Sequence, residues 1–364
     1  MSPNSSPDLR AVAARELKAM IEKGSELAIL DLREVRQALR GLTDRQPDRR
    51  LLEPIEQAAA SGRRILIGPW TGEVGFELLY WIPFVRWARA QWHIPADREV
   101  VVSRGGVASW YGQDEGHYVD IFDMFGPDEF RAAVAEEKRK RRRPGEFEDQ
   151  VVKTVSERLG VSDLEVVHPG AMYRLFEAYW RDEAGYGRLD EFTRHERLAP
   201  PTSMKPAGLP SHYTAVRFYF NECFPPTPEN RSFARNVITS IAERSPVVLL
   251  NPGFSVDDHT DWLPDGGQRI VAIDEHVTPA TNLAVQSAVI AGARAFIGTY
   301  GGYAYLAPLY GVPALAFFSK PSFKQHHLYA AQRAFAQIDA GALVPINVAD
   351  AGVVQLALGA MVPA

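Results

Sequence analysis

Two carboxylates, Glu73 and Glu77, occur in the least polar part of the chain, the stretch ILIGPWTGEVGFELLYWIPFVRWAR at 65–89. An acid that is partly removed from water has a raised pKa and becomes a better base. Either residue is therefore a candidate general base. The structural alternative is a carboxylate in the first turn of a helix, where the helix dipole stabilises it. Asp114, in the polar and aromatic segment 103–118, is a third candidate for the base.

A glycine-rich turn, GTYGGY at 298–303, lies between two apolar segments. Backbone N–H groups at the start of a helix bind anions, and glycine lets a ligand come close to the main chain. The turn therefore predicts an anion site, although many junctions between a strand and a helix need glycine for packing alone. The candidate residues are Thr299, Tyr300, Gly301, Gly302 and Tyr303.

Several charged residues could assist at such a site. Arg217 lies inside the apolar run YTAVRFYF, where an unpaired charge is costly, so it either pairs with a buried acid or faces an anionic ligand. Lys320 and Lys324 follow the run ALAFFS and could reach a diphosphate, or could be ordinary exposed lysines. Metal binding is not predicted, because the triplet DDH at 257–259 and the pair His326-His327 lack the spacing of a metal site.

Apolar runs bounded by turn residues predict the strands that position these groups. The first half of the chain has two such runs, with a helix expected from about Gly75 between them, which implies a parallel sheet. The second half has five, which alternate with helical stretches. The expected strands are RRILIGPW and REVVVSRGG, then YTAVRFYF, SPVVLLNPGF, QRIVAI, ARAFIGTY and VPALAFFS. Each half is thus predicted to be a Rossmann-like α/β domain.

Three divisions of the chain are expected. Residues 1–62 are predicted to be an N-terminal helical extension, because apolar positions recur at helical spacing and Gly62 is a typical C-cap. Residues 63–205 form the N-terminal domain and residues 206–364 the C-terminal domain, with the proline-rich stretch 198–212 between them. The final apolar stretch, VADAGVVQLALGAMV, is expected to form a helix.

Composition limits the classes of protein. A chain of 364 residues fits two domains, at roughly 150 residues each, and a net charge of −5 argues against a general nucleic-acid binder. The single cysteine, Cys223, cannot form an internal disulfide, which fits a reducing compartment. No apolar run reaches about 18 residues, so the sequence predicts a cytoplasmic soluble protein. The one basic run, EEKRKRRR at 136–143, predicts a solvated helix face or, alternatively, contact with an acidic glycan or an anionic membrane surface.

The segment GGYAYLAPLYGVPALAFFS at 301–319 resembles the donor-site segment of GT-B glycosyltransferases, and it is most similar to that of the ADP-heptose heptosyltransferases. In that group a small residue and Gly–x–x–His–Leu–Ala precede Gly–Val–Pro. The first half is similar as well, because Gly75-Phe76-Glu77 followed by PFVRWAR resembles the family's glycine loop with an acid and its helix ending in Pro–x–x–Arg. The stretch NPGFSVDDHTDWLP at 251–264 resembles the family's strand, Pro–Gly loop and Trp–Pro segment. Protein O-fucosyltransferases are similar in outline.

The resemblance implies two Rossmann-like domains that face each other across a cleft, as in the GT-B fold. It implies an inverting glycosyltransferase without metal or other cofactor, whose carboxylate deprotonates an acceptor hydroxyl, and Glu77 is the residue most similar to the family's acid. The donor would be a nucleotide-diphosphate sugar, and the acceptor a glycan, a lipid-linked molecule or a small molecule. The expected donor contacts are Arg217, Asn251, Gly253, His259, Thr299, Tyr300, Gly301, Gly302, Tyr303, Lys320 and Lys324, and the expected acceptor contacts are Gly72, Gly75, Arg104, Trp110 and Tyr111.

Three positions depart from the family pattern. Tyr305 replaces its His, Thr260-Asp261 replace a basic pair, and Leu306 replaces the Glu of retaining enzymes. The last change argues against a retaining mechanism, and the first two argue against ADP-heptose as the donor. Two other functions stay open. A sugar-nucleotide epimerase would release free sugar without an acceptor, and a nucleotide- or glycan-binding protein would keep the fold without the base.

Overall fold

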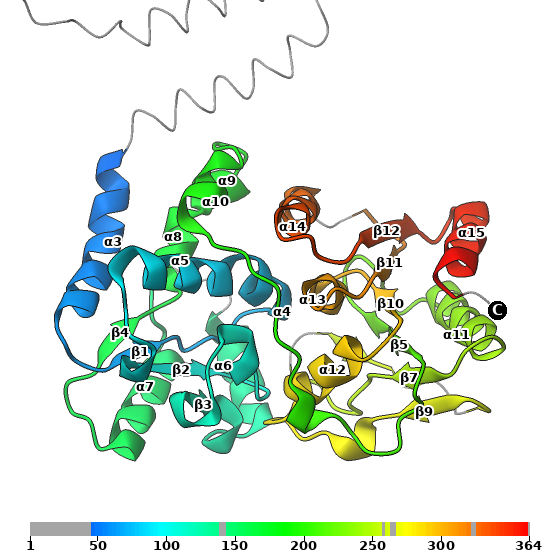
Figure 1. The fold of residues 1–364 in the computed structure, drawn as a ribbon, viewed down its shortest axis with the longest axis horizontal. Helices are drawn as coiled ribbons and strands as arrows, with labels where there is room; N and C mark the ends of the chain where they lie inside the picture. Colours follow the sequence, from blue (N-terminus) through cyan, green and yellow to red (C-terminus); the bar gives the residue numbers. More distant parts are fainter. Residues whose placement is uncertain (1–44, 138–142, 257–258, 263–266, 322–324, 363–364) are drawn as a thin grey trace, which may run out of the picture.

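The computed structural model describes residues 45–137, 143–256, 259–262, 267–321 and 325–362 (Figure 1). Helices and parallel strands alternate along these residues and form two separate parallel sheets, so the expected α/β class is confirmed. Of the expected N-terminal extension, the structure describes helix α3 (Arg45–Ala60). The rest of that extension, most of the basic run and Lys324 lie outside the described residues.

The first sheet has four parallel strands in the order β3–β2–β1–β4. Strands β1 and β2 are buried along their whole length, as expected of parallel strands with helices on both faces. The strands are β1 (Ile65–Ile67), β2 (Glu99–Ser103), β3 (Tyr118–Asp120) and β4 (Glu165–Val167). The α-helices between β3 and the second sheet are α6 (Pro127–Glu137), α7 (Glu146–Leu159), α8 (Gly170–Leu175), α9 (Glu177–Trp180) and α10 (Gly187–Phe192).

The helix after β1 is not regular. Helices α4 (Val74–Phe76) and α5 (Ile82–Trp92) are joined by a π-helical turn at Glu77–Trp81, so helical structure continues from residue 74 to 92. A π-helical turn holds one more residue than an α-helical turn and is frequent at functional sites. The prediction of a helix from about Gly75 is confirmed.

The second sheet has six parallel strands in the order β12–β11–β10–β5–β7–β9. In chain order these are the sixth, fifth, fourth, first, second and third strands of the sheet, which is the order of the doubly wound Rossmann fold. The strands are β5 (Thr214–Arg217), β7 (Val247–Leu249), β9 (Ile270–Ala272), β10 (Ala295–Thr299), β11 (Ala314–Phe318) and β12 (Leu343–Asn347), and the helices are α11 (Pro228–Ala242), α12 (Asn282–Ala291), α13 (Gly302–Leu309), α14 (Gln325–Gln337) and α15 (Ala351–Met361). All five strands predicted for this half are present.

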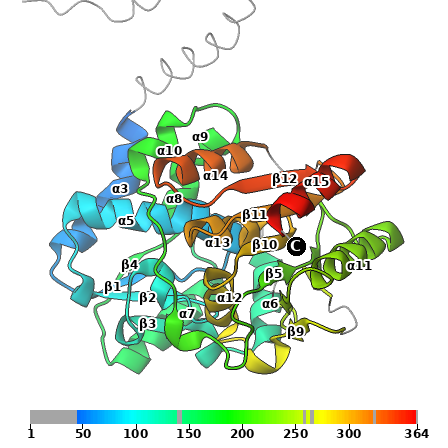
Figure 2. The same cartoon turned by 45° about the vertical axis from the view of Figure 1, so that its right-hand side comes forward.

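A short antiparallel pair stands apart from both sheets, formed by β6 (Tyr219–Phe220) and β8 (Thr260–Asp261). The expected C-terminal helix is confirmed as α15, which lies beside α11 at the end of the molecule away from the first sheet (Figures 1 and 2). None of the helices in the described part of the chain combines the length and the apolar character needed to cross a bilayer.

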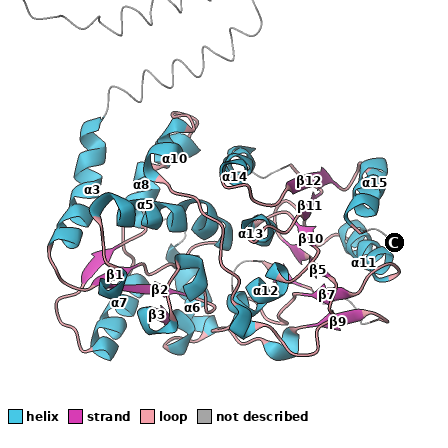
Figure 3. Ribbon diagram, viewed as in Figure 1, coloured by secondary structure: helices cyan, strands magenta, loops and turns pink. Residues whose placement is uncertain are grey.

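The two sheets form separate groups of strands, each surrounded by helices (Figure 3). The parts that carry them are in close contact, because one hydrophobic core contains buried side chains of both. Backbone hydrogen bonds also cross the boundary, from Ala284 N to Gly105 O (2.8 Å) and from Leu198 N to Leu309 O (2.9 Å). The two parts enclose a pocket, which is lined by residues of both halves of the chain.

Candidate functional site

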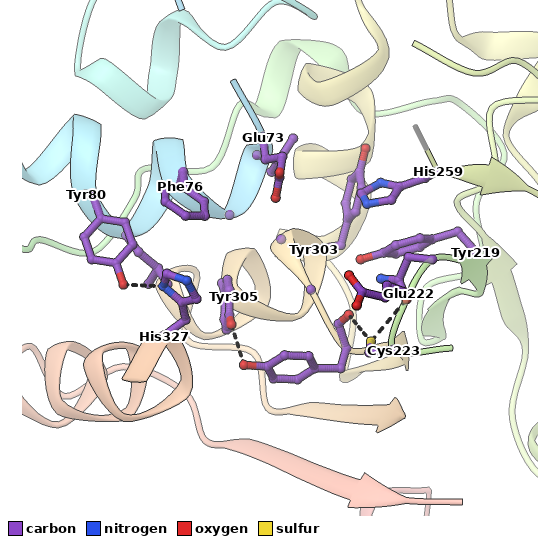
Figure 4. Close-up of a pocket in the computed structure, with 17 residues that line it drawn as sticks. Glu73, Phe76, Tyr80, Tyr219, Glu222, Cys223, His259, Tyr303, Tyr305 and His327 are labelled. Atoms are coloured by element: carbon purple, nitrogen blue, oxygen red, sulfur yellow. Dashed lines mark hydrogen bonds between the residues drawn. The ribbon is translucent and has the colours of Figure 1, made fainter. Parts of the chain in front are cut away.

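The pocket has a volume of about 310 Å³ and lies where the loops after β1 and β10 meet (Figure 4). In each sheet the chain returns to the other side of the first strand, between β1 and β4 and between β5 and β10. Ligands of open α/β sheets bind outside the carboxyl ends of the strands at such reversals. The topology thus places the pocket where a ligand site is expected in both sheets.

Two helix N-termini meet at this pocket, that of α4 and that of α13. The backbones nearly touch, because a Cβ atom built on Gly302 would lie 2.8 Å from the backbone nitrogen of Gly75. The first N–H groups of a helix have no acceptor within the helix, and they form the positive end of its dipole. Two such ends in one pocket favour a negatively charged ligand.

Glycine is required at position 302 by the opposite helix. A Cβ atom there would also lie 3.0 Å from Cβ of Val74, so a larger residue meets the first half of the chain before it meets a ligand. At Gly301 the backbone φ is 155°, and a Cβ atom would lie 2.0 Å from the hydroxyl of Tyr219. Both glycines are therefore explained by packing, whether or not a ligand binds.

We expect Gly302→Ala to lower the free energy of unfolding by about 1–3 kcal/mol, the usual cost of overpacking. Urea denaturation measures this change. Gly359→Ala is the matched control, since a Cβ atom on Gly359 in helix α15 has no neighbour within 4 Å. That control should be neutral or stabilising, because alanine favours a helix over glycine. An unchanged stability of Gly302→Ala would contradict the close contact of the two helices.

Most of the predicted glycine-turn residues line the pocket, and one does not. Tyr300, Gly301, Gly302 and Tyr303 face it. Thr299 is fully buried behind them, where its Oγ1 donates to the carbonyl oxygen of Tyr219 (2.8 Å) and accepts from the N–H of the same residue (3.1 Å). The prediction that Thr299 lines the site is wrong, and its role is to hold β10 against β6.

Arg217 ends strand β5 and is buried, with no carboxylate partner among the described residues. Its Nη1 donates to the carbonyl oxygen of Leu250 (3.4 Å) and to Oε1 of Gln286, and its Nε has no hydrogen-bond partner in the described part of the chain. The guanidinium carbon lies 3.9 Å from the ring centre of Tyr303. The Tyr303 ring therefore separates Arg217 from the main pocket, and Arg217 lines a small adjoining cavity instead.

His259 joins the two spaces, since it lines both the main pocket and the small cavity. Asn251 and Gly253 are not pocket residues. The Nδ2 of Asn251 donates to Oδ1 of Asp261 (2.6 Å) and the N–H of Gly253 to Oδ2 of the same carboxylate (3.1 Å), so both shape the loop after β7. Lys320 is exposed and does not line the pocket.

Glu77 is fully buried and does not line the pocket. Its Oε1 accepts hydrogen bonds from the hydroxyls of Ser103 (2.7 Å) and Tyr111 (2.7 Å), and its Oε2 lies 3.6 Å from Nη1 of Arg104. Burial raises the pKa of this carboxyl to about 7, although Arg104 and the two hydrogen bonds act in the opposite direction. The expectation that Glu77 faces the glycine turn is wrong, because its place in the helix directs it toward β2.

Of the three candidate bases, Glu73 is the one that lines the pocket. It is the N-terminal cap residue of α4, it is exposed, and its side chain caps no N–H group of the helix. Asp114 lies elsewhere on the surface, where its carboxylate is 2.8 Å from Nδ1 of His117. A second pocket carboxylate, Glu222, was not predicted, and it lies two residues after the expected strand YTAVRFYF.

The predicted acceptor residues are mostly structural. Gly75 lines the pocket, whereas Gly72 and Arg104 are buried outside it. Trp110 is fully buried and donates its Nε1–H to Oγ of Ser287 (2.9 Å). Tyr111 is buried against Glu77, so the expectation that these aromatic residues bind an acceptor is wrong. The aromatic residues that do line the pocket, and that the sequence analysis did not assign to it, are Phe76, Tyr80, Tyr219, Tyr305 and His327.

No protein-family model matches the chain, and no curated protein matches it significantly. Among the described residues, no group of three or more His, Cys, Asp or Glu side chains is arranged to hold a metal ion. The function therefore has to be argued from the pocket itself.

Proposed function

We propose that this chain is an inverting glycosyltransferase of GT-B type that takes a nucleotide-diphosphate sugar. The observation that carries the proposal is the pocket at the carboxyl ends of two parallel sheets, where two helix N-termini and the exposed carboxylate of Glu73 come together. Helix ends favour a diphosphate, and a carboxylate beside it can act as a base.

The diphosphate would bind at the start of α13, where Gly301, Gly302 and Tyr303 line the pocket. Tyr219 and His259 lie at this end of the pocket with their ring centres 4.6 Å apart. Arg217 adds a positive charge beneath the Tyr303 ring. This end would hold the donor, and the small cavity shared by His259 and Arg217 would extend its site.

The reaction would be a single displacement. An acceptor hydroxyl oxygen attacks the anomeric carbon, Glu73 takes the proton of that hydroxyl, and the bond from the anomeric carbon to the phosphate oxygen breaks. The bonding electrons leave with the nucleotide diphosphate, whose added negative charge the two helix ends stabilise. The anomeric configuration inverts because the attack comes from the face opposite the leaving group.

A second exposed carboxylate on the other half of the pocket, Glu222, favours a sugar-nucleotide epimerase as the alternative. Two acids on opposite sides of a sugar carbon can remove a proton and return it. Product analysis separates the functions, because an epimerase converts or releases the sugar without any acceptor.

The donor site is tested by screening UDP, GDP, ADP, CMP and TDP and the corresponding nucleotide sugars for binding. Thermal shift identifies the compounds that bind, and calorimetry then measures their affinity. We expect one nucleotide family to bind, and Arg217→Met to weaken that binding about tenfold, because it removes a buried positive charge. Lys320→Met is the control, since Lys320 is exposed and lies outside the pocket. If none of these nucleotides binds, the proposed donor class is wrong; if they bind without turnover, the chain is a binding protein.

A further inference from the structure

The end of the pocket away from His259 is formed by aromatic rings (Figure 4). The ring centre of Phe76 lies 4.9 Å from that of His327 and 5.4 Å from that of Tyr80. The hydroxyl of Tyr80 is 2.6 Å from Nδ1 of His327. Because His327 lies in the first turn of α14 and Tyr80 belongs to the π-helical turn, this aromatic end is assembled from both halves of the chain.

The rings of the aromatic end are held in place from behind. The ring centre of Trp180 lies 5.4 Å from that of Phe76 and 5.2 Å from that of Tyr80. On the opposite wall, the hydroxyl of Tyr305 is 2.6 Å from that of Tyr300. Tyr80 and Tyr305 are buried, whereas Phe76 stays half-buried and lines the pocket, so it offers an apolar surface of fixed orientation to a ligand.

We propose that the aromatic end, formed by Phe76, Tyr80, Tyr305 and His327, binds a pyranose ring of the acceptor. The inference rests on the proposed glycosyltransferase function and names the class of its acceptor. A pyranose has an apolar face of C–H groups and an edge of hydroxyls, which fits an aromatic surface with polar groups beside it. Glu73 lines the same pocket and is the N-terminal cap residue of the helix that carries Phe76, so its carboxylate is available to the hydroxyl edge of such a ring.

The size of the pocket argues for the same class of acceptor. A volume of about 310 Å³ is near the lower end of ligand pockets. It leaves no room for a long apolar chain beside a sugar phosphate. A lipid-linked acceptor would therefore insert its terminal sugar and leave its lipid outside.

The test uses methyl glucoside, methyl galactoside and methyl mannoside as probes, with binding followed by saturation-transfer NMR on the full chain. We expect at least one to bind, Phe76→Leu to weaken it about five- to tenfold, and Phe76→Tyr to restore it, since the aromatic face is what matters. Tyr329→Ala is the control, because Tyr329 lies on α14 with His327 but is exposed and outside the pocket. Thermal unfolding of each variant shows whether it is folded.

Several outcomes would overturn the inference. One is that no methyl pyranoside binds while a nucleotide does, which leaves the donor site intact and removes the acceptor subsite. Another is that pyranosides bind equally well to Phe76→Leu. A third is that Phe76→Leu binds uridine or adenosine less tightly than the unchanged protein does, while its affinity for pyranosides is unchanged. The aromatic end would then bind the nucleobase. A different outcome is that a pyranoside binds, that this binding depends on Phe76, and that no nucleotide binds. This result would contradict the proposed glycosyltransferase function and would still support a sugar site at the aromatic end.

Discussion

Glu73→Gln is expected to lower glycosyl transfer by about 10²–10⁴-fold, the usual contribution of a general base. The substitution keeps the size of the side chain and removes its ability to accept a proton. Donor affinity should hardly change, because Glu73 is exposed at the pocket and would act on the acceptor hydroxyl rather than hold the diphosphate. Initial rates with saturating donor, combined with calorimetry of nucleotide binding, measure the two quantities separately.

Two further variants make this result specific. Asp114→Asn is the matched control, because Asp114 is an exposed carboxylate that pairs with His117 outside the pocket, and it should turn over normally. Glu222→Gln tests the other pocket carboxylate. If Glu222→Gln is inactive and Glu73→Gln is active, the base lies on the second half of the chain. Normal turnover in both pocket variants would leave the proposed mechanism without a base.

The buried Glu77 is expected to make the protein less stable as the pH rises from 4.5 to 7. Burial raises its pKa in the folded chain from the ordinary value of 4.5 to about 7. Between these pH values the folded protein keeps a proton that the unfolded chain has released, so the free energy of unfolding falls with rising pH. The difference amounts to about 3 kcal/mol, which is present in full below pH 4.5 and lost by about pH 7.

Urea denaturation between pH 4.5 and 7.5 measures this dependence, and Glu77→Gln should reduce its slope. The slope should not vanish, because burial also raises the pKa of Asp120 to about 7 and adds a contribution of the same sign. Asp120→Asn is therefore the companion variant, and the double variant should lose the fall in stability. Its remaining slope should be positive up to about pH 6.5, because burial lowers the pKa of His195 from 6.5 to about 4 and the folded chain stays unprotonated where the unfolded chain binds a proton. An unchanged slope in Glu77→Gln would show that the buried carboxyl stays ionised beside Arg104.

Long apolar runs made most of the second sheet predictable from the sequence. Its missed strand, β12, contains Pro345 and lies at the edge of the sheet, where a missing N–H is tolerated. In the first sheet, β3 and β4 were missed because each has three residues and is only partly buried. Short edge strands have too few side chains to show a pattern, and pairing with a buried neighbour is what forms them.

The site was predictable in part, for a different physical reason. Glu73 and the glycine turn lie in the loops that follow β1 and β10, so their sequence position indicates their place at the carboxyl edge of the sheets. The orientation of Glu77 depends on the π-helical turn, and the residue spacing of a regular α-helix does not predict that turn. The burial of Trp110 depends on Ser287, which is distant in sequence, so no local pattern could distinguish this ring from one that binds a sugar.

The two exposed carboxylates of the pocket, Glu73 and Glu222, exert an electrostatic force on a ligand before it is bound. Among the described residues that line the pocket there is no lysine or arginine to offset the repulsion that these two carboxylates exert on an entering anion, while the attractive helix ends lie within. A neutral sugar passes this barrier without cost, whereas a nucleotide diphosphate is repelled by it until dissolved cations screen the charges. Counterions would therefore govern how fast the donor arrives more than how tightly it is held.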